Sequence, residues 1–429
     1  MTDSHLSELR FDTLDLHDTV RAGIADAGFE LCTPIQADTL PIALKGHDVA
    51  GQAQTGTGKT AAFLIAAIQR VLTYPSEASA GDQQKQPKIF ILAPTRELAI
   101  QISNDAEVLA RHTGLKIALA YGGTGYEQQR RTIEAGIDIL IGTPGRIIDY
   151  FKQGVFKLDQ VQVAILDEAD RMFDLGFIKD IRYLLRRLPA PEKRLNMLFS
   201  ATLSQRVMEL AYEHMNEPEL IQVEPDKITA DKVRQAIFFP SNEDKLPLLI
   251  GLIREMGAGR IMVFVNMKRE AEKVEDYLKV NGVDAQAISG DVPQTKRQNM
   301  LKRFLSGELA VLIGTDVASR GLHIPDVQCV INYDLPQDSE DYVHRIGRTA
   351  RAGASGDAIS FGCETYAVAL PDIEDFIGHK IPVASYNAAD LPELIKPPYR
   401  PRKPRSGPGR KSGGGGRRPS GRRPRSHKS

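Results

Sequence analysis

The sequence predicts two α/β domains, each built on a parallel sheet covered by helices, followed by a disordered basic tail. Short, continuously apolar runs recur along the chain and alternate with helical patterns, as in parallel sheets that are buried on both faces. A length of 429 residues exceeds one ordinary hydrophobic core and indicates more than one domain. Residues 396–429 carry 13 Lys or Arg and no Asp or Glu, whereas the rest of the chain is acidic.

The apolar runs give the order of the expected strands. In the first half they are KIFILAPT, KIALAYGG, DILIGTPGR, VAILDEAD and NMLFSAT; in the second half they are RIMVFVN, AQAISG, LAVLIGTD, CVINYDLP and AISFGC. Polar residues follow these runs at the carboxyl ends of the strands, where open α/β sheets bind ligands. The polar segment 223–235 is weakly patterned, so we expect it to link a first domain, residues 1–222, to a second domain, residues 236–395.

Composition restricts the class of protein. Apolar residues make up 42% and charged residues 26% of the chain, so the body is expected to be globular and soluble. No apolar run reaches the length of a membrane span, and the polar start MTDSHLSELR argues against a secretory signal. The three cysteines, Cys32, Cys329 and Cys363, lack metal-binding spacing and are expected to be buried thiols of a cytoplasmic protein.

The tail, residues 396–429, differs from the body in charge and composition. The first 395 residues contain 42 basic and 55 acidic side chains, whereas the tail is wholly basic and holds seven Pro and seven Gly. Such a segment cannot bury enough apolar surface to fold. Auxiliary, non-specific RNA binding is the favoured role. A solubility tail and an anchor for anionic lipids are the alternatives, the latter weakened by the scarcity of apolar residues.

The stretch AQTGTGKT predicts a loop that holds the phosphates of a nucleotide. Its small central residues let backbone N–H groups point at an anion, Lys59 adds a charge, and the Thr60 hydroxyl can bind Mg²⁺. The expected nucleotide-binding residues are Ala53, Gln54, Thr55, Gly56, Thr57, Gly58, Lys59 and Thr60. The strict motif begins with Gly where this chain has Ala53, so a chance cluster of turn residues is the alternative.

A second cluster, Asp167 to Asp170, directly follows the expected strand VAIL. At a strand end near a phosphate loop, Asp167 could hold Mg²⁺ through water, and Glu168 could orient and deprotonate an attacking water. A solvated acidic turn is the alternative for an isolated cluster of this kind. The combination with the phosphate loop favours nucleotide hydrolysis.

The segment HRIGRTARAG supplies cations from the second half of the chain. Arg348 and Arg351 are three residues apart, which would place both guanidinium groups on one helical face. From there they could stabilise the charge that develops on a transferred phosphoryl group. A salt-bridged surface helix is the alternative, but the window from His344 to Gly356 contains no acid.

In their order along residues 9–395, these motifs resemble those of the DEAD-box RNA helicases. The resemblance implies two tandem RecA-like domains that bind ATP, Mg²⁺ and RNA. GFELCTPIQ resembles the adenine-recognition motif at residues 9–37, in which Gln36 would bind the base edge and Phe11 would stack on it. PTRELA, the pair Gly122–Gly123 and TPGR resemble the RNA motifs of the first domain. VFVN, QTKR and GTDVASRGLHIP resemble motifs of the second.

The resemblance assigns further residues. The expected RNA contacts, suited to phosphates rather than base edges, are Thr95, Arg96, Gly123, Thr143, Gly145, Arg146, Asn266, Thr315 and Arg320. The residues that would couple hydrolysis to strand separation are Ser200, Thr202, Asp170 and His344. Two positions depart from the usual family pattern, because His323 replaces an Asp that contacts the ribose and Ala350 replaces a Gly. Ala350 is harmless if its position is helical, which we expect.

Several stretches, among them NMLFSATLS and DYVHRIGRT, are similar to the RhlB branch of the family. That branch is associated with RNA turnover alongside ribonuclease E, so the resemblance implies this partner. We expect an RNA-dependent ATPase with a monomeric core that unwinds short RNA duplexes. The alternatives are an ATP-gated RNA clamp with little turnover and a translocating DNA helicase.

Overall fold

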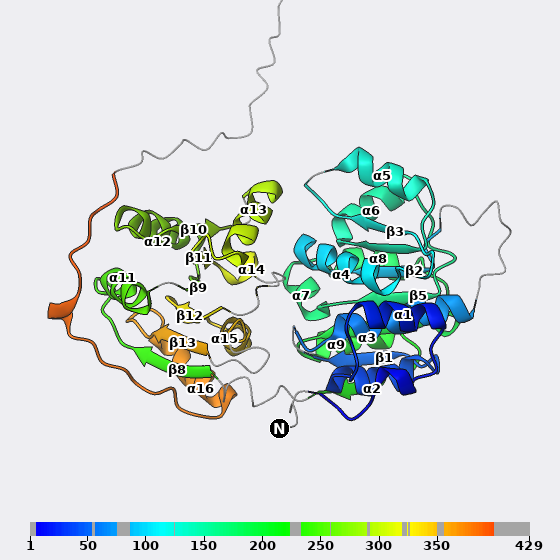
Figure 1. Ribbon diagram of the computed structural model, residues 1–429, viewed down its shortest axis with the longest axis horizontal. Coiled ribbons are helices and arrows are strands. Elements are labelled where there is room, and N and C mark those ends of the chain that lie inside the picture. Colours follow the sequence, from blue (N-terminus) through cyan, green and yellow to red (C-terminus); the bar gives the residue numbers. More distant parts are fainter. Residues whose placement is uncertain are drawn as a thin grey trace, which may run out of the picture.

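A computed structural model of the chain gives its fold (Figure 1). The structure describes residues 6–53, 56–74, 86–123, 125–223, 233–257, 259–289, 292–319, 324, 327–349 and 356–398. Within these residues the chain forms a seven-stranded sheet in the order β3-β4-β2-β5-β6-β1-β7 and a six-stranded sheet in the order β10-β11-β9-β12-β13-β8. Neighbouring strands of both sheets are parallel. The predicted fold class, two tandem RecA-like α/β domains, is confirmed.

The first sheet and its helices form domain 1. Its strands are β1 Val49–Gln52, β2 Ile89–Leu92, β3 Ile117–Ala120, β4 Ile139–Gly142, β5 Val163–Leu166, β6 Leu195–Ser200 and β7 Glu219–Gln222. Its helices are α1 Asp18–Asp26, α2 Pro34–Ala43, α3 Lys59–Thr73, α4 Arg96–Leu109, α5 Tyr126–Glu134, α6 Pro144–Lys152, α7 Ala169–Asp174, α8 Ile178–Leu185 and α9 Gln205–His214, with short 3-10 turns at Phe11–Thr13 and Pro191–Lys193.

Both faces of the first sheet are buried, because alternate residues of a strand point to opposite sides. Ile89 and Ile91 of β2 belong to the core under α1–α4, whereas Phe90 and Leu92 belong to the core under α5–α9. This arrangement explains why the central strands read as continuous apolar runs rather than alternating ones.

The second sheet and its helices form domain 2. Its strands are β8 Val233–Phe238, β9 Ile261–Phe264, β10 Ala285–Ile288, β11 Val311–Gly314, β12 Cys329–Asn332 and β13 Gly356–Phe361. Its helices are α11 Lys245–Met256, α12 Lys268–Val280, α13 Gln294–Leu305, α14 Asp316–Ser319, α15 Ser339–Ile346 and α16 Leu370–Ile377, with 3-10 turns at Ala367–Ala369 and Ala388–Asp390. The two domains face each other with α7 of domain 1 and α14 and α15 of domain 2 on the inner sides (Figure 1).

Strand β8 corrects one predicted boundary. The expected linker extends to residue 235, whereas β8 begins at Val233 and pairs along its whole length with β13. β8 lies at the edge of the sheet, and only Val233 and Ile237 of its residues are fully buried. An edge strand of this kind lacks the continuous apolar run that marks a central strand. Residues 224–232 and the tail from residue 399 onward lie outside the described residues.

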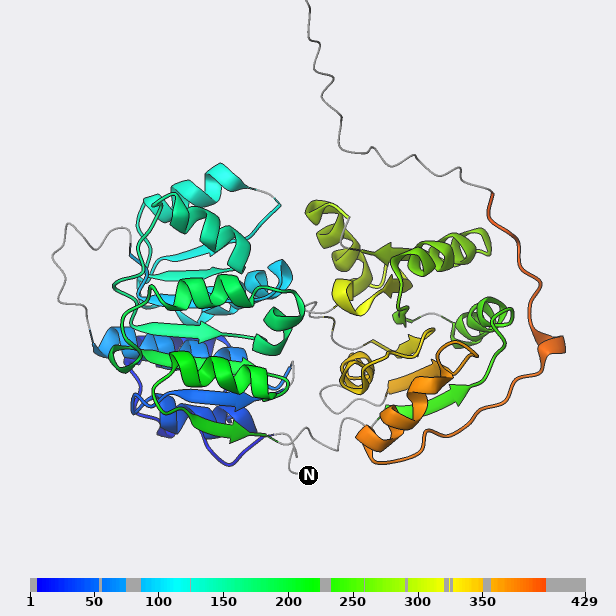
Figure 2. The ribbon, with the colours of Figure 1, turned by 180° about the vertical axis from the view of Figure 1, so that it is seen from behind.

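A C-terminal strap, residues 379–398, runs along the outside of domain 2 (Figure 2). Val383 forms a parallel bridge with Ile237 of β8, and the Tyr386 hydroxyl donates to Asp244 Oδ2 at 2.9 Å. Near its end, Ile395 exchanges two hydrogen bonds with the Asn281 side chain, at 3.0 and 2.9 Å. The strap therefore ends at the loop between α12 and β10.

An ion pair joins the two domains. Arg297 of α13 lies 2.7 Å from Glu97 of α4, and both side chains are about nine-tenths buried. Arg297 also donates to the carbonyl of Ala318, so it is fixed within its own domain. Among the described residues, none of the helices combines the length and the apolar character that crossing a membrane requires.

Candidate active site

The predicted phosphate loop lies between β1 and α3. Gly56 and Gly58 adopt φ values of 90° and 91°, and Gly58 is the N-cap of α3. A Cβ on Gly58 would lie 2.6 Å from the Gln36 amide, so this position accepts only glycine without rearrangement. The loop thus presents the N-terminus of a long helix, which favours anions. Gln54 and Thr55 lie outside the described residues.

Ala53 explains why the loop does not need Gly at its first position. Its backbone is not in the left-handed region, and its N–H donates to the carbonyl of Ser200 at 2.9 Å. The Ala53 methyl is buried in the core of domain 1, where it packs as an ordinary apolar group.

Lys59 and Asp167 form a buried ion pair at the centre of the site. Lys59 Nζ lies 2.9 Å from Asp167 Oδ1, and the side chains are 4% and 0% exposed. Burial works against a charged Lys59, but the carboxylates of Asp167, Glu168 and Asp170 outweigh it and raise the pKa of the ammonium group. Burial raises the pKa of Asp167 against the opposing pull of Lys59. Asp167 Oδ2 is buried and has no hydrogen-bond partner among the residues that the structure describes.

Glu168 is held in an unusual backbone conformation. It adopts φ 53° and ψ 55° at the N-cap of α7, a region that non-glycine residues visit rarely. Its side chain is buried, and within the described part of the chain Oε2 has no hydrogen-bond partner. The carboxylate oxygens of Asp167 and Glu168 that lack a partner among the described residues are the hard oxygen ligands that Mg²⁺ prefers, and Thr60 adds a hydroxyl from the first turn of α3.

Ser200 connects this carboxylate cluster to the phosphate loop. The backbone N–H of Asp170 donates to Ser200 Oγ at 3.1 Å, while the Ser200 carbonyl accepts from Ala53 N–H at 2.9 Å. The end of β6 therefore touches both the loop after β1 and the turn after β5. Ser200 and Asp170, two of the expected coupling residues, are thus in direct contact.

Gln36 and Phe11 occupy positions that differ from the expected base contact. The Gln36 amide donates to the Gly58 carbonyl at 3.0 Å and accepts from Thr33 N–H at 2.8 Å, so it braces the phosphate loop. Phe11 is only 3% exposed and stacks against Phe29 with ring centres 6.0 Å apart. In this conformation neither side chain is open to a base, because both are already packed or bonded within domain 1.

A cavity of about 440 Å³ extends between the domains. Domain 1 lines it with Lys59, Glu168, Asp170 and Thr202, and domain 2 lines it with Asp338, Glu340, Asp341, His344 and Arg348, among other residues. The structure thus brings Arg348 and His344 to the same space as the expected catalytic residues of domain 1. Arg351 lies outside the described residues.

The expected helical face of Arg348 and Arg351 is wrong for Arg348. Helix α15 ends at Ile346, and Arg348 lies in the turn that follows. Thr349 Oγ1 and the Arg348 carbonyl both bond to the backbone of Val327, which pulls the chain away from the helix axis. Gly347, a weak helix former, stands at the point where the helix stops. Ala350, which we expected to be helical, lies outside the described residues.

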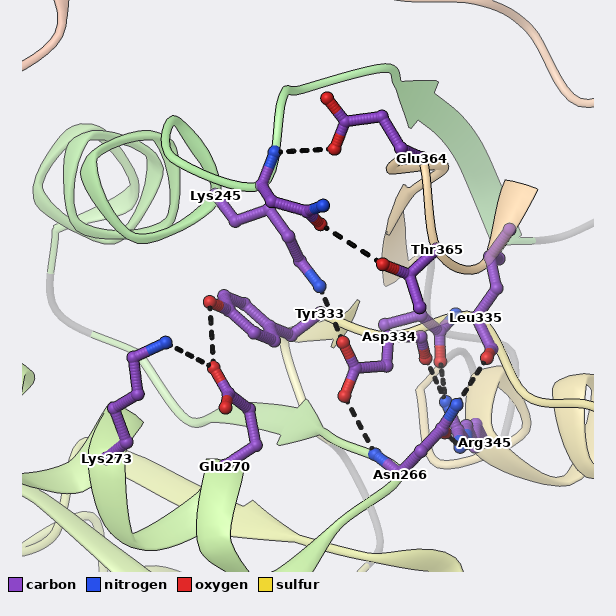
Figure 3. A network of polar contacts seen from close by, with 12 residues as sticks. Lys245, Asn266, Glu270, Lys273, Tyr333, Asp334, Leu335, Arg345, Glu364 and Thr365 are labelled. Carbon is purple, nitrogen blue, oxygen red and sulfur yellow. Dashed lines mark hydrogen bonds and ion pairs between the residues drawn. The ribbon is translucent and has the colours of Figure 1, made fainter.

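Arg345 anchors α15 inside domain 2 (Figure 3). It is 1% exposed and bonds to both carboxylate oxygens of Asp316, at 2.7 and 2.6 Å. It also donates to Asn266 Oδ1 at 2.9 Å and to the Asp334 carbonyl at 2.6 Å. Arg345 is therefore salt-bridged, but it is buried and its acid comes from α14, so it does not match the alternative of a salt-bridged surface helix.

Lys245 and Asp334 form a second buried ion pair beside Arg345 (Figure 3). The Lys245 Nζ to Asp334 Oδ1 distance is 2.5 Å, and the side chains are 6% and 2% exposed. Asp334 Oδ2 accepts from Asn266 N–H at 2.9 Å, and the ammonium group lies 4.1 Å from the centre of the Tyr333 ring. Every charged atom of this pair faces a partner, so the pair is a structural brace.

The expected RNA contacts of domain 1 line a separate groove of about 450 Å³. Thr95, Arg96, Thr143, Gly145 and Arg146 lie along it, and Val292 and Arg297 of domain 2 close its other side. Gly123 adopts φ 101° directly under Arg96, where a Cβ would lie 2.4 Å from the guanidinium group. All of these residues follow the carboxyl ends of strands.

The described RNA contacts expected in domain 2, Asn266 and Thr315, are half-buried. The Asn266 side chain is bonded to the Leu335 carbonyl and to Arg345, so it is committed to the interior. Thr315 precedes α14, and its carbonyl accepts hydrogen bonds from Ala318 and Ser319. Arg320 and His323 lie outside the described residues.

Arg146 is held in place by aromatic residues that the sequence did not indicate. Its guanidinium group lies 4.9 Å from the Tyr126 ring centre and 5.3 Å from that of Tyr150. Its Nη1 donates to Gln129 Oε1 at 3.0 Å and to the Tyr150 hydroxyl at 3.1 Å. Arg146 is thus fixed in position at the edge of the groove.

Two parallel-sheet domains that share one cavity between their sheet edges define a class of protein, the ATPases with tandem RecA-like domains. A family model described as DEAD/DEAH box helicase matches residues 33–210, and one described as helicase conserved C-terminal domain matches residues 244–353. The chain is 58% identical over 397 residues to the ATP-dependent RNA helicase RhlB of Haemophilus influenzae, covering 92% of this chain and 95% of that protein.

The RhlB helicase of Shewanella halifaxensis is 56% identical over 400 residues, with 93% of this chain and 91% of that protein covered. Among solved structures, S. cerevisiae Dbp5 bound to RNA and ADP BeF3 is similar, with a TM-score of 0.75, 30% identity, and coverage of 87% and 95% of the two chains. The chain belongs to the DEAD-box family of ATP-dependent RNA helicases. Its resemblance to the RhlB branch, expected from the sequence, is confirmed.

Proposed function

We propose that this protein is an RNA-dependent ATPase that separates short RNA duplexes locally, with Mg²⁺ as its metal cofactor. The observation that supports this most directly is the cavity lined by Lys59 and Glu168 of domain 1 and by Arg348 of domain 2. Because the residues of the proposed reaction come from both domains, hydrolysis requires the domains to be together, which positions the groups without further ordering.

Each residue of the cavity has a proposed role. Lys59 and the backbone amides of the loop before α3 bind the outer phosphates. Glu168, through its unpartnered Oε2, orients the attacking water and accepts its proton. Arg348, and Arg351 by its place in the sequence, would stabilise the charge that develops on the transferred group. When bound, Mg²⁺ would neutralise phosphate charge, and Asp167, through water, and Thr60 are the residues that would hold it.

RNA would lie in the groove between α4, α6 and α13. Thr95, Arg96 and Arg146 offer hydroxyl and guanidinium groups suited to the phosphate backbone, which allows binding without sequence preference. The Glu97–Arg297 ion pair borders the same groove and joins the domains, so RNA binding and domain approach would favour each other. A strand held in this way cannot stay paired with its complement if its path is bent.

The cellular setting is proposed on similarity alone. The likeness to RhlB helicases supports a cytoplasmic role in RNA degradation with ribonuclease E as partner. The basic tail, residues 396–429, would add non-specific RNA affinity. Binding of purified ribonuclease E, measured by calorimetry with the full chain, tests the partner directly, and a lack of heat change would contradict it.

The experiment for the main proposal measures ATP hydrolysis with and without single-stranded RNA, with single-stranded DNA as the comparison. We expect stimulation by RNA and not by DNA, loss of hydrolysis in Glu168→Gln, and persistence of the effect in a chain ending at residue 395. ATP-dependent RNA binding without turnover would instead support a clamp. Stimulation by DNA would support a DNA helicase.

A further inference from the structure

Helices α6 and α8 carry a run of cations that leads away from the RNA groove. We call Lys152, Lys179, Tyr183, Arg186 and Arg187 the α6–α8 strip. Its four cations are exposed, and Tyr183 is half-buried between them. The two helices lie side by side on the face of domain 1 that Figure 2 turns to the viewer, where they cover the sheet together with α9.

Two cations of the strip, Lys152 and Arg187, lie against the Tyr183 ring. The Arg187 guanidinium group lies 3.4 Å from the centre of the Tyr183 ring, and Lys152 Nζ lies 5.4 Å from it. Arg187 Nη1 also donates to the Tyr183 carbonyl at 2.7 Å, which holds it against the end of α8. Phe151 packs edge-on against Tyr183 with ring centres 6.3 Å apart. Lys152 and Arg187 are therefore held against an aromatic ring, and Lys179 and Arg186 are exposed beside them on α8 and at its C-terminal end.

The strip is continuous with the proposed RNA groove. Gly145 and Arg146 in the first turn of α6 line the groove, and so does Phe177, the N-cap of α8. Lys179 and Tyr183 are four residues apart, and Arg187 follows after four more, so they lie along one side of the helix. Both helices begin at the groove and run away from it for about 12 Å, at about 1.5 Å per residue.

The charge of the strip is opposite to that of the body around it. Residues 1–395 contain more acidic than basic side chains. Two acids adjoin the strip, Asp149 and Asp180, and Asp149 accepts a hydrogen bond from Gln153 at 2.8 Å. The neighbouring Glu213 is paired with Arg182 at 2.8 Å. The four exposed cations of the strip therefore outnumber the two acids that helices α6 and α8 carry.

We propose that the α6–α8 strip binds the phosphate backbone of RNA that extends beyond the groove. This rests on the proposed function, because the strand reaches the strip only by leaving the groove at the first turn of α6. An acidic protein would be attracted by the same charge, but it would not be led onto the strip from the groove. Contacts to phosphates alone would add affinity without sequence preference.

The test compares two charge-reversal variants of the full chain, each binding two lengths of single-stranded RNA in the presence of a non-hydrolysable ATP analogue. The first variant is Lys179→Glu with Arg186→Glu, which leaves the Tyr183–Arg187 contact intact. The matched control is Lys45→Glu with Lys116→Glu. These lysines are exposed and precede β1 and β3, at the edge of the sheet opposite the groove. The basic tail is present in both variants and contributes equally.

An RNA of about 6 nucleotides fills the groove, and one of about 20 nucleotides extends well beyond a single binding site. We expect the strip variant to bind the longer RNA about tenfold more weakly than the control at about 0.1 M salt and the shorter RNA equally well. The slope of log affinity against log salt for the longer RNA should fall by about 1.4, from two lost phosphate contacts.

Equal losses for both lengths, or equal behaviour of the two variants on the longer RNA, would overturn the proposal. Weaker binding to phosphatidylserine vesicles with unchanged RNA affinity would assign the strip to lipid and would overturn it too. A fall in melting temperature with no change in RNA affinity would reduce the strip to a packing contact. If the unmodified chain bound neither RNA, the failure would belong to the proposed function instead.

Discussion

Each domain buries a Lys–Asp ion pair at the carboxyl edge of its sheet, and the two pairs differ in how completely they are bonded. In domain 2, Asp334 faces Lys245 with one oxygen and Asn266 N–H with the other. In domain 1, Asp167 faces Lys59 with Oδ1, while none of the described residues bonds to Oδ2. Both carboxylate oxygens are therefore bonded in the domain 2 pair, whereas only one is bonded within the described residues in the domain 1 pair.

This difference distinguishes a structural ion pair from one that can bind a ligand. A buried charge without a full set of partners costs stability, so it persists where something outside the protein completes it. Lys59 and Glu168, the neighbour of Asp167, also line the interdomain cavity, whereas Lys245 and Asp334 are not among its described lining residues. We therefore expect the Lys245–Asp334 pair to govern stability and the Lys59–Asp167 pair to govern catalysis.

The largest effect is expected at the Lys59–Asp167 pair. Asp167→Asn removes the charge proposed to hold Mg²⁺ through water, which contributes several kcal/mol to the reaction. RNA-stimulated ATP hydrolysis should fall by about a thousandfold. The melting temperature should stay within a few degrees, because Glu168 and Asp170 remain beside the Lys59 ammonium group and the substitution also removes a poorly solvated carboxylate. A large loss of stability with residual hydrolysis would mean that this pair is a brace like the other.

A substitution in the Lys245–Asp334 pair should lower stability and leave activity unchanged. Lys245→Met leaves Asp334 buried without its cation, and breaking such a pair costs about 3 kcal/mol of the free energy of unfolding. Urea denaturation measures the loss, and the ATP turnover of the folded fraction should be unchanged. The double variant Lys245→Met with Asp334→Asn is the control, since it should recover part of the stability. An equal loss in both variants would show that packing against Tyr333, rather than charge, matters.

Arg146 tests the comparison on a cation that is bonded on one side and borders the groove on the other. Tyr126→Ala removes one aromatic face from the guanidinium group, so Arg146 must be ordered when RNA binds. The RNA concentration for half-maximal ATPase stimulation should rise about tenfold with little change in the maximal rate. Tyr126→Phe keeps the ring and should behave as the unmodified protein. Equal effects of Tyr126→Ala with and without Arg146→Ala would contradict the role.

The smallest effect is expected at Asp105 of α4, a carboxylate whose burial raises its pKa to about 6 from 3.8. Above pH 6 the group is charged in the folded state at a cost to stability, and the cost shrinks as the pH falls toward 4. Asp105 is partly exposed, so the cost is about 1 kcal/mol rather than the full value of the shift. Asp105→Asn should raise the melting temperature at pH 8 and have less effect at pH 4.5. The same increase at both values would exclude a charge effect.

Contiguous features were predictable from the sequence, and assembled ones were not. The central strands are uninterrupted apolar runs, and the phosphate loop and the Asp167–Asp170 cluster are each a few consecutive residues, so their chemistry is visible in the order of letters. Strands β1, β7 and β8 are not among the predicted runs, because β1 contains Gly and Gln and the other two expose or half-expose most of their residues. Their signal is diluted by polar side chains.

The brace around Arg345 shows why part of the site could not be predicted. Asn266, Asp316, Asp334 and Lys245 come from separate elements, and only the folded sheet brings them to one point. Lys245 did leave a trace, since it is a lone cation heading the apolar helix sequence KLPLLIGLI. Glu97 and Arg297 left none, because their contact depends on how the two domains face each other.

The C-terminal strap determines the point on domain 2 to which the tail is attached. Its two hydrogen bonds between Ile395 and Asn281 fasten the chain to domain 2, at the loop after α12. The 31 residues beyond Pro398 therefore travel with domain 2, whatever domain 1 does. Any RNA that they hold stays at a raised local concentration when the domains part. The tail would then tether the RNA and favour its rebinding over its dissociation.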